Sequence, residues 1–234
     1  MGYPADREII ECISQQRRLK RTLRELTDRH LLVRTRAGDE DTYSAHAIVC
    51  TYYYDLPNRR ELRGMHQRAA VYYEEGLTEN FQAAAHFERA GDYLKSADLI
   101  SHDVWGLMTQ GQVSALNLLL TRLTTHWHRH IPVAGPEAEA HVDVHIAHGQ
   151  VCRFLGDIDA AEAHYQTALE KLHQLPNATD RSERKAQVAL GMGEALRDKA
   201  PEIALEWLER GLAELFESQS SDCLLYTSPS PRDS

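Results

Sequence analysis

A pattern of small and large apolar residues after residue 137 most constrains the fold of this chain. In "HGQVCRFLGDIDAAEAHYQTALEKL", Ala161, Tyr165 and Ala168-Leu169 follow Gly156-Asp157 at the spacing A-x3-Y-x2-A-L. That spacing places small and bulky apolar side chains on one face of an α-helix. Small alanines let a paired helix approach closely, and the tyrosine ring fills the space beside them. Because glycine followed by aspartate ends one helix and begins the next, the stretch predicts an antiparallel pair of helices.

A second stretch repeats the pattern nearer the C-terminus. In "ALGMGEALRDKAPEIALEWLERGLAEL", Ala204, Leu208 and Gly211-Leu212 take the same relative places, 43 residues after the first copy. A weaker pair of helices is predicted around the turn at Gly91-Asp92, and "GQVSALNLLLTRL" (111–123) is the next apolar-faced helix. A helical hairpin cannot bury its apolar face alone, so the pattern predicts hairpins stacked into a solenoid.

These hairpins resemble tetratricopeptide repeats. The spacing A-x3-Y-x2-A-L matches the second helix of that repeat, and Gly149 falls where the first helix requires a small residue. His145 stands at the position of the consensus tryptophan, and the closing proline comes late, at Pro176. The loop around Pro176 and Asn177 lengthens the period beyond the usual 34 or so residues. We therefore expect a mainly α chain with degenerate repeats over residues 79–220.

Residues 1–78 have a different pattern, which is typical of a winged-helix domain. An amphipathic helix with Leu19, Leu23 and Leu26 leads into a short apolar strand over 31–33. "RAGDED" supplies the residues of a tight turn, and "TYSAHAIVCTYYYDL" continues as a second strand and a helix. Another helix is predicted in "RRELRGMHQRAAVYYEEGL". The order helix, two-stranded wing, helix is the winged-helix layout.

The order of these pieces resembles a junction in STAND-type signal-transduction ATPases, a class that includes bacterial transcription activators. The segments "LRELTDRHLLVRTRAGDEDTYSAHAIVCTYY", "HQRAAVYYEEG" and "AAAHFERAGDYLKSADLI" carry the resemblance, which covers about residues 15–215. It implies an upstream ATPase domain in cis, with ATP or ADP and Mg²⁺ in the longer parent and no cofactor in this chain. It also implies that His46 faces nucleotide. The acidic residue that follows in the family motif is Ala47 here, and the alternative is a histidine held by the backbone between wing and helix.

The sequence contains no catalytic constellation. The motif G-x-x-x-x-G-K-[ST] is absent, and "GMGEAL" (191–196) neither follows a strand nor opens a nucleotide-binding helix. Cys50 and Cys152 have histidines nearby in sequence, but no orienting group or oxyanion hole is indicated, so buried cysteines are expected. Three glutamates are interpreted as the solvated face of one helix: Glu202, Glu206 and Glu209. The chain is predicted not to be an enzyme.

Thirteen histidines raise the question of a metal site. His141, His145 and His148 fall on one helical face, and H-x3-H is a workable spacing for two zinc ligands. The repeat pattern buries positions 145 and 148 against the second helix, so we predict packed histidines and no metal site. The histidines of "HWHRH" (126–130) alternate at i, i+2 and point in different directions, so this segment is predicted to end a helix.

Charge is distributed unevenly, which bears on nucleic-acid binding. Residues 1–80 hold 13 basic and 13 acidic side chains, whereas residues 81–234 hold 13 and 22 and account for the net charge of −9. The acidic part argues against an extended nucleic-acid surface there. One basic cluster is a candidate DNA contact: Arg17, Arg18, Lys20, Arg21 and Arg24. The alternative is a solvated or interdomain face, because Glu25 and Asp28 follow at once.

The remaining features concern the compartment and the C-terminal tail. No run of about 18 apolar residues is present, and the N-terminus lacks the pattern of a secretory signal. Four scattered cysteines suit a reducing compartment, so we expect a cytoplasmic protein without a membrane partner. "CLLYTSPSPRD" (223–233) resembles the translation of a transposase-type sequencing adapter. Residues 221–234 are therefore interpreted as an artefactual or disordered tail on a metagenomic fragment.

These observations predict a non-catalytic sensor or scaffold that is part of a STAND-type regulatory ATPase. Its helical repeats would bind a protein, a peptide or a small inducer. The alternative is a stand-alone winged-helix DNA-binding transcriptional regulator, with the repeats serving oligomerisation or ligand sensing.

Overall fold

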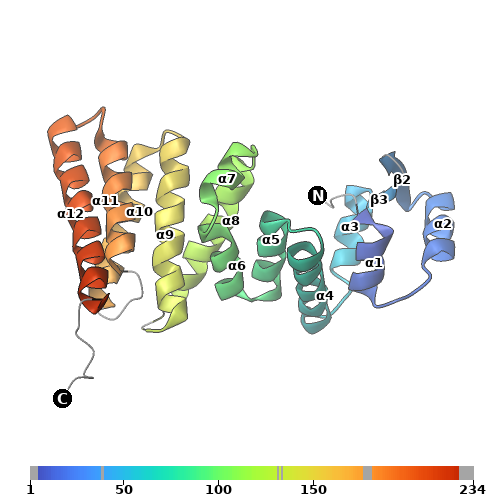
Figure 1. The fold of residues 1–234 in the computed structure, drawn as a ribbon. Coiled ribbons are helices and arrows are strands. Elements are labelled where there is room, and N and C mark those ends of the chain that lie inside the picture. Colours follow the sequence, from blue (N-terminus) through green and yellow to red (C-terminus); the bar gives the residue numbers. More distant parts are fainter. Residues whose placement is uncertain (1–4, 38–39, 131, 133, 176–180, 227–234) are drawn as a thin grey trace, which may run out of the picture. The chain divides into compact units, whose positions relative to one another are not determined.

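The computed structural model of the chain describes residues 5–37, 40–130, 132, 134–175 and 181–226, without the side chains of 37, 40 and 217–226. The chain is mainly α-helical, as predicted, with one small antiparallel sheet among the described residues (Figure 1). It divides into two compact units, Met1–Leu99 and Ile100–Ser234. The predicted boundary at 78/79 lies inside the first unit, and the domain assignment stays a prediction. The interpretation of residues 221–234 as a tail also stays a prediction: residues up to 226 belong to the last helix, and residues 227–234 lie outside the described part.

The first unit contains the helix, two strands and helix that the sequence predicted, in that order, preceded by a short strand and a helix that were not predicted. They are β1 (Ala5–Asp6), α1 (Arg7–Ser14), α2 (Lys20–Asp28), β2 (Leu32–Ala37), β3 (Glu40–Ala45) and α3 (Ala47–Tyr54). The strands form an antiparallel sheet in the order β1-β3-β2, with Leu32 opposite Ala45 and Thr35 opposite Thr42. Leu19 and Leu23 are buried, as the amphipathic pattern requires. This arrangement is compatible with a winged helix.

The rest of the first unit is helical. It contains α4 (Arg59–Val71), a π-helical turn (Tyr72–Gly76), α5 (Asn80–Ala90) and α6 (Tyr93–Ser101). Asn58 begins α4 with a capping box, in which its side chain accepts from the Glu61 backbone N–H and the Glu61 side chain accepts from the Asn58 N–H. Gly91 ends α5 in the left-handed region at φ 89°, so the predicted turn between α5 and α6 is confirmed.

The second unit consists of helices that pack as antiparallel neighbours (Figure 1). They are α7 (Val104–Thr109), α8 (Val113–Arg129), α9 (Pro136–Phe154), α10 (Ile158–Gln174), α11 (Arg181–Leu196) and α12 (Pro201–Tyr226). Each of α7, α9 and α11 is the first helix of a hairpin, and α8, α10 and α12 are the second helices. The first helices also contact one another, α7 with α9 and α9 with α11, as they do in a stacked array.

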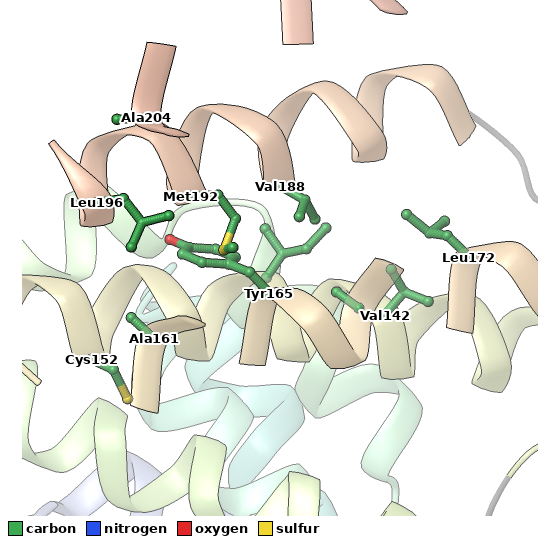
Figure 2. Close-up of a cluster of buried hydrophobic side chains, with 11 residues drawn as sticks. Val142, Cys152, Ala161, Tyr165, Leu172, Val188, Met192, Leu196 and Ala204 are labelled. Atoms are coloured by element: carbon green, nitrogen blue, oxygen red, sulfur yellow. The ribbon is translucent and has the colours of Figure 1, made fainter. Parts of the chain in front are cut away.

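Tyr165 lies in a buried hydrophobic cluster that joins α9, α10 and α11, as the repeat spacing predicted. Its ring is fully buried and lies beside Met192 and Val188 of α11 (Figure 2). A Cβ added to Gly149 of α9 would lie 2.6 Å from the ring, and one added to Gly191 of α11 would also collide with it. The glycines of α9 and α11 therefore make room for one tyrosine from α10. The "GMGEAL" segment serves helix packing.

Among the described residues, no helix has the length and the apolar content that crossing a membrane requires.

Candidate functional site

The first helices of the hairpins line a polar groove in the second unit. A cavity of about 360 Å³ lies between α9, α11 and the segment that joins α6 to α7. Its lining comprises Ser101, His102, Val104, Asp143, Ile146, Ala147, Gln150, Glu183, Arg184 and Gln187. Ile146 and Ala147 are buried and form an apolar floor, whereas the other α9 and α11 residues carry charged or amide groups. Such a lining can hold an extended backbone and charged side chains.

Arg184 ties the two helices of this groove together. Its Nε and a terminal nitrogen donate to both carboxylate oxygens of Asp143, at 2.6 and 2.8 Å. The other terminal nitrogen donates to Glu139 at 3.3 Å. The Arg184 side chain is only 15% exposed, so this bidentate pair holds the groove wall in a defined geometry.

Four histidines gather between α9 and α10. His141, His145 and His148 lie on one buried face of α9, which confirms the prediction that they pack against the second helix. His164 of α10, which the sequence analysis did not single out, lies against them: its Nδ1 is 3.1 Å from His145 Nδ1. His145 Nε2 is in turn 3.2 Å from His141 Nε2. We call the hydrogen-bonded chain of His141, His145 and His164 the histidine chain.

His148 is held separately, beside the histidine chain. Its Nε2–H donates to the Asn117 side-chain oxygen of α8 at 3.0 Å, and its ring stacks on His164 with 3.9 Å between centroids. Because the amide oxygen can only accept, the proton of the neutral ring lies on Nε2 and the lone pair on Nδ1. That Nδ1 is buried and has no hydrogen-bond partner.

Burial keeps these histidines neutral near pH 7. It lowers the pKa of His141 and His148 to about 4, with smaller contributions from neighbouring positive groups. It lowers the pKa of His145 to about 3, where the adjacent histidines add to the effect, and it also lowers the pKa of His164. Neutral rings carry free lone pairs, which is the form that binds metals and accepts hydrogen bonds.

Cys152 lies one helical turn after His148 on the same face of α9. One ligand atom from each of His148, Cys152 and His164 lies within 4.8 Å of the other two. Burial raises the pKa of the Cys152 thiol, and the Asp157 charge adds to this, so the thiol is protonated at neutral pH. A protonated buried thiol is a poor nucleophile. The sequence analysis expected a buried cysteine here, and Cys152 is 6% exposed.

A second cavity, of about 350 Å³, reaches the histidine chain. Its lining comprises Thr124, Thr125, His128, His141, His145, Thr167 and Lys171. Lys171 of α10 contributes a positive charge there that helps to lower the pKa of His141 and His145. The cavity lies between α8, α9 and α10 and borders the histidine chain.

A separate aromatic cluster lies in the first unit. The Tyr54 hydroxyl is 2.9 Å from His66 Nε2, and His66 Nδ1 is 2.9 Å from His86 Nδ1. Tyr73 stacks on the His86 ring at 5.5 Å between centroids. These contacts join α3, α4, the π-helical turn and α5, and they serve to fix the packing of the first unit.

The other residues singled out from the sequence lie apart from these sites. His46 is exposed at the N-cap of α3 and makes no side-chain capping hydrogen bond, so its role as a nucleotide-facing residue stays a prediction. Cys50 is partly buried, with its Sγ 3.5 Å from the Ala45 carbonyl oxygen. His126 and His128 lie in the last turn of α8, as predicted for the "HWHRH" segment. The three glutamates of α12 are exposed, also as predicted: Glu202, Glu206 and Glu209.

Comparison of the chain with known protein families, curated proteins and solved structures found no match. The features of the chain that bear on its function are the groove, the histidines and the basic cluster of the first unit.

Proposed function

We propose that the second unit is a non-catalytic binding module that holds an extended peptide segment, from a partner protein, in the groove of α9 and α11. The observation that carries this proposal is the groove itself: an apolar floor between two parallel-running first helices, bordered by amides and carboxylates. Extended peptides need both apolar pockets and hydrogen-bonding groups at intervals, which this lining supplies. A small inducer is the alternative ligand for a cavity of about 360 Å³.

The charge of the groove favours a basic or amide-rich peptide. Asp143 and Glu139 both bind Arg184, and Glu183 adds a further carboxylate to the lining. A peptide lysine or arginine would meet an excess of negative charge at this wall.

In the architecture that the sequence resemblance implies, the module acts as a sensor within a longer STAND-type regulatory ATPase. The winged-helix-like elements of the first unit precede the hairpins in the order that this class has. Ligand binding in the groove would favour one of two states of an ATPase domain in cis. Recovery of the surrounding gene tests this: a P-loop in the same frame, upstream, supports the proposal, and an in-frame stop shortly before Met1 contradicts it.

Gln187→Arg is expected to weaken peptide binding about tenfold or more, because a long cation at the groove would fill it and repel a basic peptide. Gln166→Arg is the matched control: each glutamine is exposed and donates to a glutamate one turn earlier, Gln166 on α10 and Gln187 on α11. Peptides selected from a display library on the full chain provide the probe, and fluorescence anisotropy gives the affinity. Equal effects of the two substitutions would place the peptide elsewhere.

One observation favours DNA binding by the first unit as a second candidate function. The helix α2 precedes the β2–β3 hairpin, and Lys20, Arg21 and Arg24 are exposed on it. In a winged helix the helix before the wing is the one that enters the major groove. Arg21 is partly neutralised, because its Nε lies 3.0 Å from Glu25.

If this second function holds, Arg24→Glu is expected to lower DNA affinity at low salt by about tenfold, because it replaces a phosphate contact by a repulsive charge. Arg197→Glu, an equal charge change on an exposed residue of the second unit, should have little effect. An electrophoretic mobility-shift titration at two salt concentrations measures both variants. Absence of retention of the full chain at low salt ends this candidate.

A further inference from the structure

We propose that the second unit binds a zinc-class transition-metal ion through His148, Cys152 and His164. The proposal rests on the placement of one thiol and two imidazoles from α9 and α10: a ligand atom of each residue lies within 4.8 Å of the other two. Ligand atoms on one tetrahedral ion lie closer than this, and imidazole lone pairs lie in the ring plane, so the stacked rings of His148 and His164 must rotate out of their stack to close the site. The proposal is independent of the peptide groove.

The turn between α9 and α10 brings the three ligand side chains close together. His148 and Cys152 are separated by one helical turn, so their side chains lie on one face of α9. The turn at Gly156 and Asp157 brings α10 back alongside, with Gly156 in the left-handed region at φ 82° and Asp157 capping α10. His164 lies as many residues after Gly156 as His148 lies before it, and the two rings therefore face each other.

The His148 ring is oriented as a metal ligand would be. Its Nε2–H is engaged by the Asn117 oxygen, which leaves a lone pair on a buried Nδ1 that meets no donor. The residue is only 5% exposed, so this atom has lost water without gaining a partner. An amide or carboxylate that fixes the remote N–H of a histidine is the usual support behind a metal-bound imidazole. A metal ion at Nδ1 would satisfy the atom.

His164 has a comparable support in the histidine chain. When His164 Nδ1–H donates to His145 Nδ1, and His145 Nε2–H donates to His141 Nε2, both contacts are satisfied by neutral rings, and the proton of His141 lies on its buried Nδ1, which has no partner. The Nε2 of His164 then carries a lone pair for an ion. His145 thus acts as a positioning residue for His164.

The donor set selects the class of ion. One thiolate and two imidazoles suit Zn²⁺ and its tetrahedral substitute Co²⁺, whereas Mg²⁺ and Ca²⁺ prefer oxygen ligands. Binding breaks the S–H bond of Cys152 and forms a metal–sulfur bond, so one proton leaves to solvent for each ion bound. Three protein ligands leave a fourth position for water or an exogenous ligand.

Cobalt titration tests the proposal on the full chain, purified without a polyhistidine tag and stripped of metal with a chelator. In a background where the other cysteines are replaced (Cys12→Ser, Cys50→Ser and Cys223→Ser), Cys152 is the only thiol. We expect one equivalent of Co²⁺ to produce tetrahedral ligand-field bands and a thiolate charge-transfer band, both removed by Zn²⁺. Zn²⁺ should also raise the midpoint of thermal unfolding as its free concentration rises.

Variants separate this site from adventitious binding to histidine. Cys152→Ala should abolish the charge-transfer band, and Asn117→Ala, which removes only the support of His148, should weaken Co²⁺ binding about 10- to 100-fold. His126→Gln, on a histidine in the last turn of α8, is the control and should change nothing. Tetrahedral Co²⁺ bands that Cys152→Ala leaves with unchanged affinity overturn the proposal, and so does a titration of the parent chain in which the charge-transfer band does not form.

Discussion

Replacing Tyr165 by alanine is expected to lower the free energy of unfolding of the second unit by about 3–5 kcal/mol. The ring is fully buried in the cluster that joins α9, α10 and α11. Gly149 and Gly191, whose backbones lie close to the ring, have no side chains to move into the cavity. All three tryptophans of the chain lie in the second unit, so their fluorescence during urea denaturation measures this unit within the full chain.

A double-mutant cycle shows whether the packing of Tyr165 against Gly191 is the cause. Alone, Gly191→Ala should lower the free energy of unfolding of the second unit by about 1–3 kcal/mol, because the added Cβ would collide with the Tyr165 ring. Combined with Tyr165→Ala, the same Cβ occupies the cavity and improves helix propensity, so it should stabilise by up to about 1 kcal/mol. Tyr165→Phe keeps the ring and should cost less than about 1 kcal/mol. Additive effects of the two substitutions would mean that the ring is not held between the glycines.

The hairpins of the second unit could be predicted because their signal is local. The A-x3-Y-x2-A-L spacing and the Gly156-Asp157 turn each depend on neighbours within one or two helical turns, and both were confirmed. The glycines of "GMGEAL" were recognised as part of a repeat helix, but their partner was not. Gly191 is opposed by a residue 26 positions earlier in the chain, and only stacking of successive hairpins brings the two together.

The histidine sites could be predicted only in part, because some of their contacts also depend on how separate helices stack. The spacing of His141, His145 and His148 placed them on one buried face, which the structure confirms. His164 was missed, although counting outward from the Gly156-Asp157 turn puts it opposite the first helix of its hairpin. The Asn117 contact could not be predicted, because the loop between α8 and α9 does not reveal how α8 is rotated about its own axis.

Acidification from pH 7.5 to pH 5 is expected to destabilise the first unit through His66 and His86. Burial, aided by the positive charge of Arg89, lowers the pKa of His66 to about 4; burial together with the His66 and Arg89 charges does the same for His86. The unfolded chain takes up protons near pH 6.5, whereas the folded rings stay neutral until about pH 4. Stability is therefore complete above pH 6.5 and falls as the pH drops towards 4, by on the order of 2 kcal/mol per ring at pH 5.

The geometry of the His66–His86 pair gives an independent reason to expect that acidification lowers the stability of the first unit. The two Nδ1 atoms lie 2.9 Å apart and can share only one proton, so protonation of both rings must break this contact. Hydrogen exchange of peptides from α4 and α5, corrected for intrinsic rates, measures the local opening free energy between pH 5 and 7.5. In the double variant His66→Gln, His86→Gln, the local opening free energy should be lower at pH 7.5 and should change less with pH. His46→Gln, on an exposed histidine of the same unit, should leave the slope unchanged. If the wild-type slope is already flat, the pair is not neutral in the folded state, and the Nδ1 contact does not hold α4 to α5.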